Sequence, residues 1–324
     1  MDLRLYKKAV YFVLLCAGMV FAGAGRAFAF DRQTAASLSR YIMAGVYEKQ
    51  GDVNRAIQEY KKALAANEKN AVIHLSLAAA YIKNNQLPEA IAEINRSSEL
   101  EPDAVEPYAV LALLYFSQDK MAEAGKAYEK ALKNAVKNEP KNIHIYKSLG
   151  ILYLQQKQYK QAQEAFTVVV GLESKDYEAH FYLANILDEQ KKRPDAIKQL
   201  QTVLELKPDY HPALNYLGYV YVEENRNLSE AEKMIKKALQ LDTRNGAYVD
   251  SLGWLYFKQG RTQDAIRELE RASSLLEDPV IFDHLGDAYF KMKNLEKAKQ
   301  NWEKSLKLDP EQETVKKKLE KLPS

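Results

Sequence analysis

The sequence predicts an all-α protein built as an α-solenoid, a stack of about eight helix–turn–helix repeats. Glycine (13) and proline (10) are scarce among the 324 residues, so turns are few and short. Alanine recurs ahead of amphipathic stretches at intervals of 33 to 38 residues. These alanines are Ala56, Ala90, Ala124, Ala162, Ala196, Ala231, Ala265 and Ala298. A period of this length is typical of stacked supersecondary units.

Three further positions in each repeat predict how its two helices pack. A small residue stands twelve residues before each alanine (thirteen in the sixth repeat): Ala44, Ala78, Ala112, Gly150, Ala184, Gly218, Gly253 and Gly286. Three residues later comes Tyr47, Tyr81, Tyr115, Tyr153, Tyr221, Tyr256 or Tyr289, with Leu187 as the exception. The second helix adds Tyr60, Ile94, Tyr128, Phe166, Leu200, Ile235, Leu269 and Trp302. We expect the small residues to let the helix axes approach and the large ones to fill the space between them.

Residues 1–29 have the order of a secretory signal peptide. Arg4, Lys7 and Lys8 precede an apolar stretch over 9–25, and the small-residue sequence AFA follows at 27–29. We expect cleavage after Ala29 and a periplasmic or exported protein. The alternative is an uncleaved inner-membrane anchor, but a spanning helix needs about 20 apolar residues and Arg26 interrupts this run.

The charge and cysteine content exclude several classes of function. Residues 1–29 hold four of the 47 basic and one of the 44 acidic residues, which leaves 43 of each in the remainder. A neutral chain gives no reason to expect general affinity for nucleic acid. The single cysteine, Cys16, also lies in this segment, and the preceding Leu15 does not fit a lipoprotein signal. Without another cysteine the rest of the chain forms no disulfide.

The sequence also predicts where some helices begin, which connections are lengthened and how the array ends. Pro88 and Pro194 fall in the first turn of second helices, and Ser229 to Glu232 (SEAE) reads as a capping box. The stretch KNAVKNEPKN (133–142) adds about one helical turn to the third repeat, and ENRN (224–227) lengthens one turn by a residue. The tail at 314–322 places Val315, Leu319 and Leu322 on one side, as a capping helix would.

These positions resemble the tetratricopeptide repeat, whose pattern runs Leu-Gly, Tyr, Ala, Phe and Pro with a period of about 34 residues. The resemblance covers residues 37–310. It implies a signal peptide (1–29), an array (30–310) and a capping tail (311–324), wound as a right-handed superhelix. The expected repeats are 37–70, 71–104, 105–142, 143–176, 177–210, 211–245, 246–278 and 279–312.

The resemblance also implies a concave binding surface lined by positions 2, 5, 9, 12 and 13 of each repeat. In the first half these are largely apolar: Leu38, Leu75, Ala79, Ile82, Leu113, Phe116, Ile151 and Leu154. In the second half polar and aromatic residues prevail, and Asp188 is one of them. The candidate partner-binding set is Asn185, Asn215, Tyr219, Asp250, Trp254, Phe257, Asp283, Asp287 and Phe290. The Lys/Asn/Arg set that clamps a peptide carboxylate in some family members is absent, since Ile151 replaces its asparagine.

Nothing in the repeats predicts catalysis. The five histidines fall in different repeats, at different places within them and without metal-ligand spacing, and no nucleophile elbow or phosphate loop occurs. The one acidic cluster is Asp283, His284 and Asp287. An enzyme or cation-binding protein of unrecognised type that uses this cluster is the alternative to a scaffold, although a solvated acidic face explains it better.

The sequence therefore predicts a non-enzymatic protein–protein interaction scaffold of the cell envelope without a cofactor. Its expected partner is an extended peptide or helix of another envelope protein, and by resemblance it would assist the assembly of pili, exported polysaccharide or outer-membrane complexes. Trp254 and Phe257 share a helix face near Asp250, Asp283 and Asp287. Two interpretations stay open for Trp254: contact with a partner, or packing against the next repeat's first helix. On the first, the aromatic pair is dispensable for stability and an apolar anchor beside Lys or Arg is expected in the partner.

Overall fold

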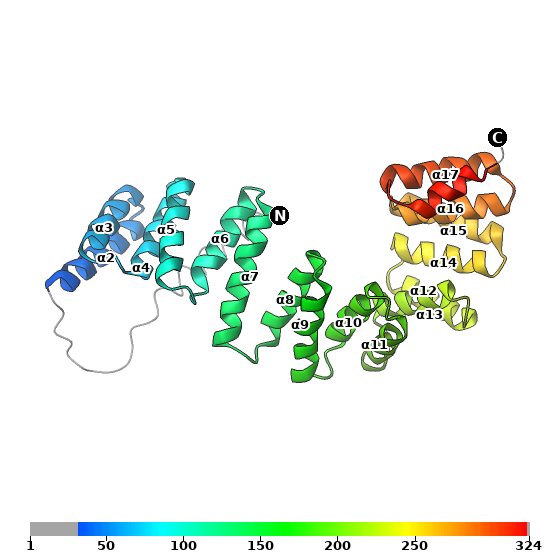
Figure 1. Ribbon diagram of the computed structural model, residues 1–324, viewed down its shortest axis with the longest axis horizontal. Coiled ribbons are helices and arrows are strands. Elements are labelled where there is room, and N and C mark those ends of the chain that lie inside the picture. The colour runs from blue at the N-terminus through cyan, green and yellow to red at the C-terminus, as the bar shows by residue number, and fades with distance from the viewer. Residues whose placement is uncertain (1–31, 323–324) are drawn as a thin grey trace. The chain divides into compact units, whose positions relative to one another are not determined.

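The computed structural model describes residues 32–322, which form 17 α-helices, α2 to α18, and no strand (Figure 1). The predicted all-α class is confirmed. The expected signal segment 1–29, with Cys16 and the cleavage site after Ala29, lies outside the described residues. Within those residues no helix is long and apolar enough to cross a membrane.

The helices alternate between two kinds, here called first and second helices. The first helices are α2 (Arg32–Lys49), α4 (Ala71–Lys83), α6 (Glu106–Ser117), α8 (Ile143–Gln155), α10 (Tyr177–Glu189), α12 (His211–Glu223), α14 (Gly246–Lys258) and α16 (Pro279–Lys291). The second helices are α3 (Val53–Ala66), α5 (Leu87–Leu100), α7 (Met121–Asn138), α9 (Tyr159–Leu172), α11 (Arg193–Leu206), α13 (Leu228–Leu241), α15 (Thr262–Leu275) and α17 (Leu295–Leu308). A short helix, α18 (Glu313–Glu320), follows them.

The chain divides into two compact blocks, one ending at Leu152 and one beginning at Tyr153. In the N-terminal block, α2 packs on α3, α4 on α5 and α6 on α7, and α3–α4 and α5–α6 contacts join the pairs. In the C-terminal block the pairs are α10–α11, α12–α13, α14–α15 and α16–α17, with α18 on α17. There the first helices also touch one another, α12 with α14 and α14 with α16.

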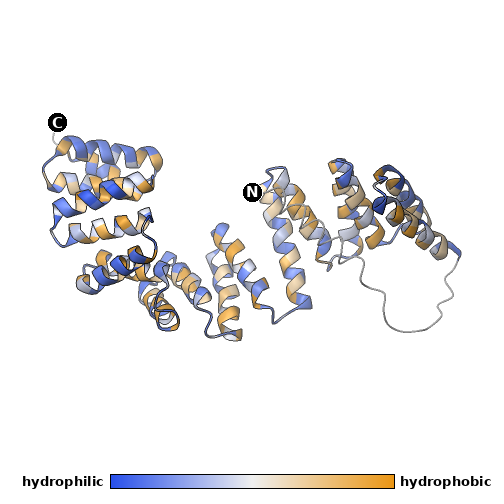
Figure 2. Cartoon of the chain, turned by 180° about the vertical axis from the view of Figure 1, so that it is seen from behind, coloured by the Kyte–Doolittle hydropathy of each residue, from blue (hydrophilic) through white to orange (hydrophobic). Residues whose placement is uncertain are grey.

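The residues that define the repeat are the ones buried between paired helices. Every small residue of the first helices and every repeating alanine of the second helices is buried, as are seven of the eight large residues on the second helices. Figure 2 shows apolar and polar residues alternating around the helices, as expected when each helix buries one side. The predicted packing of small against large residues is thus confirmed.

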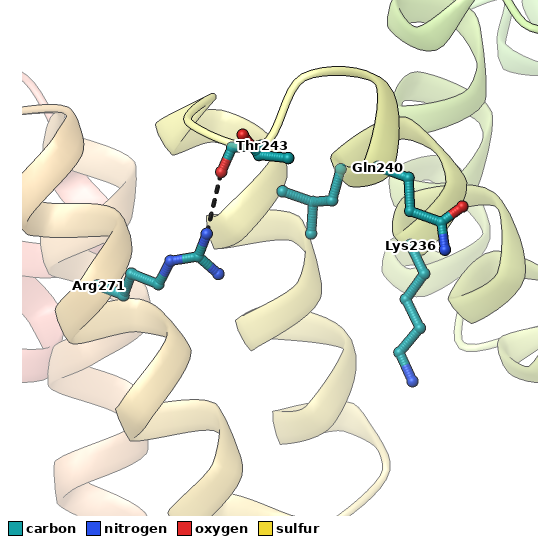
Figure 3. A pocket seen from close by; sticks show the side chains of 5 residues that line it. Lys236, Gln240, Thr243 and Arg271 are labelled. Atoms are coloured by element: carbon teal, nitrogen blue, oxygen red, sulfur yellow. Dashed lines mark hydrogen bonds between the residues drawn. The ribbon is translucent and has the colours of Figure 1, made fainter.

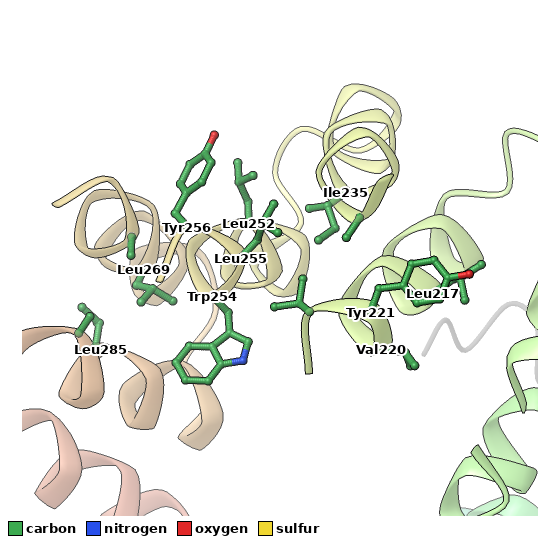
Figure 4. Close-up of a cluster of buried hydrophobic side chains, with 14 of the residues drawn as sticks. Leu217, Val220, Tyr221, Ile235, Leu252, Trp254, Leu255, Tyr256, Leu269 and Leu285 are labelled. Carbon is green, nitrogen blue, oxygen red and sulfur yellow. The ribbon is translucent and has the colours of Figure 1, made fainter. Parts of the chain in front are cut away.

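The glycines show how close the helices come. A Cβ atom built on Gly253 would lie 2.7 Å from Leu269 Cγ, and one on Gly218 would lie 2.8 Å from Ile235 Cγ1. At Gly286 it would overlap the Trp302 indole. Each glycine thus faces the large second-helix residue of its own repeat. Figure 4 shows this core in the C-terminal block, with Leu269 and Ile235 on either side of the α14 side chains.

The third repeat departs from this pattern. Tyr128 is 42% exposed, so the expectation that it fills the core is wrong. Its helix, α7, buries Ala124, Ala127 and Ala131 instead, and Tyr128 lies outside that alanine face. The helix has 18 residues where the other second helices have 14, so the inserted stretch is absorbed as one extra turn.

The turns inside the repeats share one conformation. Each contains a residue with positive φ: Gly51, Asn85, Asp119, Lys157, Lys191, Asn225, Gly260 and Lys293. The longer turn at 224–227 has a second one, Asn227, directly before α13. The capping box predicted at Ser229 is therefore wrong, because α13 begins at Leu228 and Ser229 already lies inside it. Pro88 and Pro194 do occupy first turns, as predicted.

The tail folds as expected of a cap. Val315 of α18 is fully buried, and Leu319 and Leu322 pack against the core of the C-terminal block. The apolar side of α17 is therefore covered by the chain itself.

We expect Gly286→Ala to lower the free energy of unfolding by about 1–3 kcal/mol, because its methyl group must displace the rigid Trp302 ring. Gly171→Ala in α9 is the matched control. Its Cβ would meet nothing within 4 Å, so the helix gains stability, by roughly 0.5–1 kcal/mol. Urea titration of both variants measures the two effects, and equal stabilisation by both would disprove the close contact.

Candidate functional site

The nine candidate partner-binding residues all lie on four first helices of the C-terminal block: α10, α12, α14 and α16. The side of these helices that carries them is here called the first-helix face. Asn185 comes from α10, Asn215 and Tyr219 from α12, and the others from α14 and α16. Their surroundings differ sharply in burial and hydrogen bonding.

Trp254 is held between repeats. It is only 7% exposed, and its ring stacks on Phe257 at 4.8 Å and on His284 at 4.0 Å between centroids. Its indole N–H donates to Glu223 Oε1 over 2.7 Å, and Lys258 Nζ lies 4.7 Å from the ring centre. The expectation that this aromatic pair is dispensable for stability is wrong for Trp254, because its contacts join α12, α14 and α16.

Asp250 and His284 form a buried pair between consecutive first helices. His284 Nδ1 lies 2.9 Å from Asp250 Oδ1, and both side chains are buried. Burial alone would lower the pKa of His284, but the Asp250 carboxylate, with Asp283 and Asp287, outweighs it and holds the pKa above its ordinary value. The imidazole therefore stays protonated more readily than a free histidine.

The remaining two carboxylates bind a lysine of the cap. Lys318 Nζ lies 2.6 Å from Asp283 Oδ1 and 2.7 Å from Asp287 Oδ1. Trp302 also donates its indole N–H to Asp287, over 3.2 Å. Burial, together with Asp283, raises the pKa of Asp287 although Lys318 opposes this.

The acidic cluster therefore does not converge as a cation site. The ammonium group of Lys318 lies against both aspartates, and His284 is turned to Asp250. Over residues 32–322 no three His, Cys, Asp or Glu side chains are grouped as metal ligands. The expectation that Asp250, Asp283 and Asp287 offer their charge to a Lys or Arg of the partner is corrected as well, since all three carboxylates have partners within the chain.

Asp188 was expected on this face, but two links between its helices were not predicted. Asp188 of α10 accepts from Tyr216 of α12 over 2.9 Å and pairs with Arg193 at 2.8 Å. Burial opposes ionisation of Asp188, but these two donors keep its pKa below the ordinary value. Together with Glu223–Trp254, these links place a carboxylate between successive first helices. A carboxylate followed about one repeat later by an aromatic donor would have been the signal to search for.

The other candidate residues retain capacity for a partner. Asn215 Oδ1 is buried and has no hydrogen-bond partner among the described residues. Burial raises the pKa of Tyr219, one turn further on, and Glu223 and Asp250 add to this, so its hydroxyl stays neutral. Asn185 donates to the Phe181 carbonyl over 2.7 Å. Phe257 is half-buried, whereas Phe290 is 46% exposed.

The apolar residues expected to line the binding surface of α2, α4, α6 and α8 differ in exposure. Leu38, Phe116 and Ile151 are exposed, and the others are partly buried: Leu75, Ala79, Ile82, Leu113 and Leu154. These side chains carry no hydrogen-bonding groups, so they offer packing surface alone.

Two histidines have a structural role that repeats, contrary to the expectation that all five differ in position. His74 and His180 are each the fourth residue of a first helix. His74 lies 2.6 Å from Glu93 and 2.9 Å from the Glu68 carbonyl, and His180 lies 2.6 Å from Gln199 and 3.0 Å from the Ser174 carbonyl. Each histidine ties its helix to the second helix of the repeat and to the preceding turn.

The surface depressions lie elsewhere. One of about 310 Å³ is lined by Lys236, Leu239, Gln240, Thr243 and Arg271, from α13 to α15 (Figure 3). Its two cations are engaged, Lys236 with Glu232 at 2.6 Å and Arg271 with the Thr243 carbonyl at 3.0 Å. This depression brings together no groups for chemistry.

The His284–Asp250 pair predicts how stability depends on pH. Folding raises the pKa of His284 above its value of about 6.5 in the unfolded chain. The pair therefore stabilises the fold fully below that pH, and this stabilisation is lost as the pH rises through the pKa of His284 in the folded chain. We expect the Tm to fall over that window, and Asp250→Asn to flatten the fall. Thermal melts across pH measure this, with the exposed His144→Gln as control; equal slopes for wild type and Asp250→Asn would refute it.

Comparison with known proteins places this architecture in a family. A tetratricopeptide-type family model, described as the cilia and flagella-associated protein 70 C-terminal domain, matches residues 26–212, more than half of the chain. Tetratricopeptide-repeat models match residues 183–248 and 279–312. Proteins built from this repeat are protein–protein interaction scaffolds, and those with this fold are generally non-enzymatic.

Relatives and solved structures agree in fold. The TPR repeat-containing protein PA4667 of Pseudomonas aeruginosa is 23% identical over 250 residues, which is 77% of this chain and 36% of that protein. The chain thus spans about a third of that relative's length, and less of several others.

Two solved structures are similar in fold alone. PilW, described as a type IV pilus biogenesis factor, has a TM-score of 0.53 at 17% identity, covering 66% of this chain and 98% of PilW. The APC/C hetero-tetramer Cut9–Hcn1 has a TM-score of 0.53 at 16% identity, covering 87% of this chain and 69% of that one. The repeating small and aromatic residues, the paired helices that they produce and the family matches establish that the chain belongs to the tetratricopeptide-repeat family.

Proposed function

We propose that this chain is a non-enzymatic scaffold of the cell envelope. It holds an extended peptide or a helix of another envelope protein against the first-helix face of the C-terminal block. The observation that carries the proposal is a buried acceptor without a partner, Asn215 Oδ1, on the same face as the exposed ring of Phe290.

The polar part of recognition falls to Asn215 and its neighbour. A buried carbonyl without a hydrogen bond costs about 1–3 kcal/mol. Asn215 as a whole is partly exposed, so a rotation of its side chain would bring Oδ1 to the surface, where a partner's backbone N–H would remove that cost. Tyr219 lies one turn further along α12 and carries a neutral hydroxyl that either donates or accepts. An extended segment presents alternating N–H and C=O groups and therefore fits this pair.

The apolar part falls to the two phenylalanines. Phe257 and Phe290 are each the twelfth residue of a first helix, on the consecutive helices α14 and α16. A basic residue of the partner would have to compete with His284 and Lys318 for the carboxylates. We therefore infer that an apolar anchor and main-chain hydrogen bonds carry the affinity, and that the partner's charge adds little.

Placement in the envelope rests on residues 1–29. A basic start, an apolar middle and a small-residue end are the order of an export signal. Among envelope processes, assembly of pili, exported polysaccharide or outer-membrane complexes suits a peptide-holding array. Pilus biogenesis is the role by which PilW is described, and PilW shares the fold at low identity.

The binding prediction uses the exposed ring of Phe290 and the half-buried ring of Phe257. We expect Phe257→Ala with Phe290→Ala to weaken partner capture from the cell's own envelope extract by about 2 kcal/mol, roughly thirtyfold. Leu241→Ala, at an exposed position on α13, is the matched control and should leave capture unchanged. Titration calorimetry with the captured partner measures the change.

Stability is monitored in parallel. Trp254→Ala is a poor probe of binding, because loss of a buried indole costs about 3–5 kcal/mol and should lower the Tm much as Gly253→Leu does. Recovery of nucleic acid or lipid without protein, or capture unaffected by the double variant, would refute the proposed function.

The export prediction is that the native protein begins at Phe30. Aminoterminal sequencing of the protein isolated from its own cells decides this. If the apolar run at 9–25 is retained, the chain is anchored in the inner membrane and the proposal of release fails.

A further inference from the structure

The first described helix, α2, has an apolar side that nothing in residues 32–322 covers. Leu38, Ile42, Met43 and Val46 are 38%, 58%, 45% and 40% exposed. Their spacing of three to four residues puts them along one side of the helix. Four large apolar residues exposed together on one helix mark an interaction surface rather than ordinary scattered exposure.

The positions equivalent to Met43 and Val46 are buried in every other first helix. Met43 is the seventh residue of its repeat and Val46 the tenth. The seventh residues of the other repeats are Leu77, Leu111, Leu149, Leu183, Leu217, Leu252 and Leu285, all buried. The tenth residues are Ala80, Leu114, Leu152, Ile186, Val220, Leu255 and Ala288, all buried.

The sixth residue of the repeat shows that this side of a first helix contacts the preceding repeat. Ile42 is the sixth residue of its repeat, and the sixth residues Tyr216 and His284 contact the preceding repeat. Tyr216 donates to Asp188, and His284 stacks on Trp254. The exposed side of α2 is therefore a stacking surface that no helix within residues 32–322 covers.

Residues 32–322 do not supply that partner. At the other end of the array α18 covers α17, and it is held there by Val315 and Lys318. A second copy therefore finds no open stacking surface at that end.

The surface also suits a copy of itself. Between Ala35 and Val46 the one charged residue is Arg40, and its guanidinium pairs with Glu59 at 3.0 Å. A twofold contact brings each residue near its own equivalent, and an uncharged apolar stripe does this without like-charge repulsion. We propose that two copies of this chain form a twofold dimer by packing the Leu38–Ile42–Met43–Val46 surface of α2 against the same surface of the second copy.

The experiment is sedimentation velocity of the purified chain over a wide range of concentration. A concentration-dependent dimer is expected for wild type. Ile42→Asp should raise the dimer Kd tenfold or more, because an unpaired carboxylate in an apolar contact costs more than about 1.4 kcal/mol. The Tm of Ile42→Asp should match wild type, since the side chain is exposed in the single chain.

Two further arms make the result specific. Val280→Asp places the same charge at a similarly exposed position on α16 and should leave the dimer intact. An equimolar mixture of Ile42→Asp and Ile42→Lys should associate again, because opposite charges then meet across the twofold axis. A wild type that stays monomeric throughout, or an Ile42→Asp variant that dimerises as wild type does, overturns the proposal. Capture of the envelope partner is expected to be unchanged in Ile42→Asp, so this proposal and the proposed function fail separately.

Discussion

The structure depends on one close contact, the small residue of a first helix against the large residue of the second helix in the same repeat, from which only the third of the described repeats departs. Gly218, Gly253 and Gly286 leave no room for a Cβ atom opposite Ile235, Leu269 and Trp302. Because a dense interior tolerates neither a gap nor an overlap, this contact fixes the distance between the paired helices. The alanines of the second helices are buried for the same reason.

Once the pairs are fixed, the first helices of the C-terminal block stand close enough to share side chains. Asp188–Tyr216, Glu223–Trp254 and Asp250–His284 each join one first helix to the next. These links remove most of the negative charge that the sequence predicted for the face, because each carboxylate already has a hydrogen-bond donor within the chain. What remains for a partner is apolar area and the unpaired carbonyl of Asn215.

The two ends of the helical array are finished differently. Its C-terminal end is closed by α18, whose Val315 and Lys318 serve the core and the aspartates of α16. Its first described helix leaves Met43 exposed where every other repeat buries a leucine, and Ile42 exposed where Tyr216 and His284 contact the preceding repeat. A repeat array stays soluble when its terminal surfaces are either polar or covered, so this asymmetry has a physical consequence for association.

The sequence alone determined the fold class, because close packing restricts residue size at fixed intervals and leaves a period visible along the chain. It also located the one-turn insertion in α7 and the cap, both of which follow from helical spacing.

The sequence alone did not determine which partners the polar groups have. The capping box at Ser229 failed because one extra residue let Asn227 adopt a left-handed conformation, and Tyr128 left the core because alanines form the buried face of α7. The site depended still more on tertiary structure, because its contacts join residues about one repeat apart. Only the stacking of the helices brings Asp250 to His284 and encloses Trp254. The same stacking places Lys318 against Asp283 and Asp287. Size is recorded residue by residue, whereas a charge or a hydrogen bond takes its meaning from whichever side chain the fold brings against it.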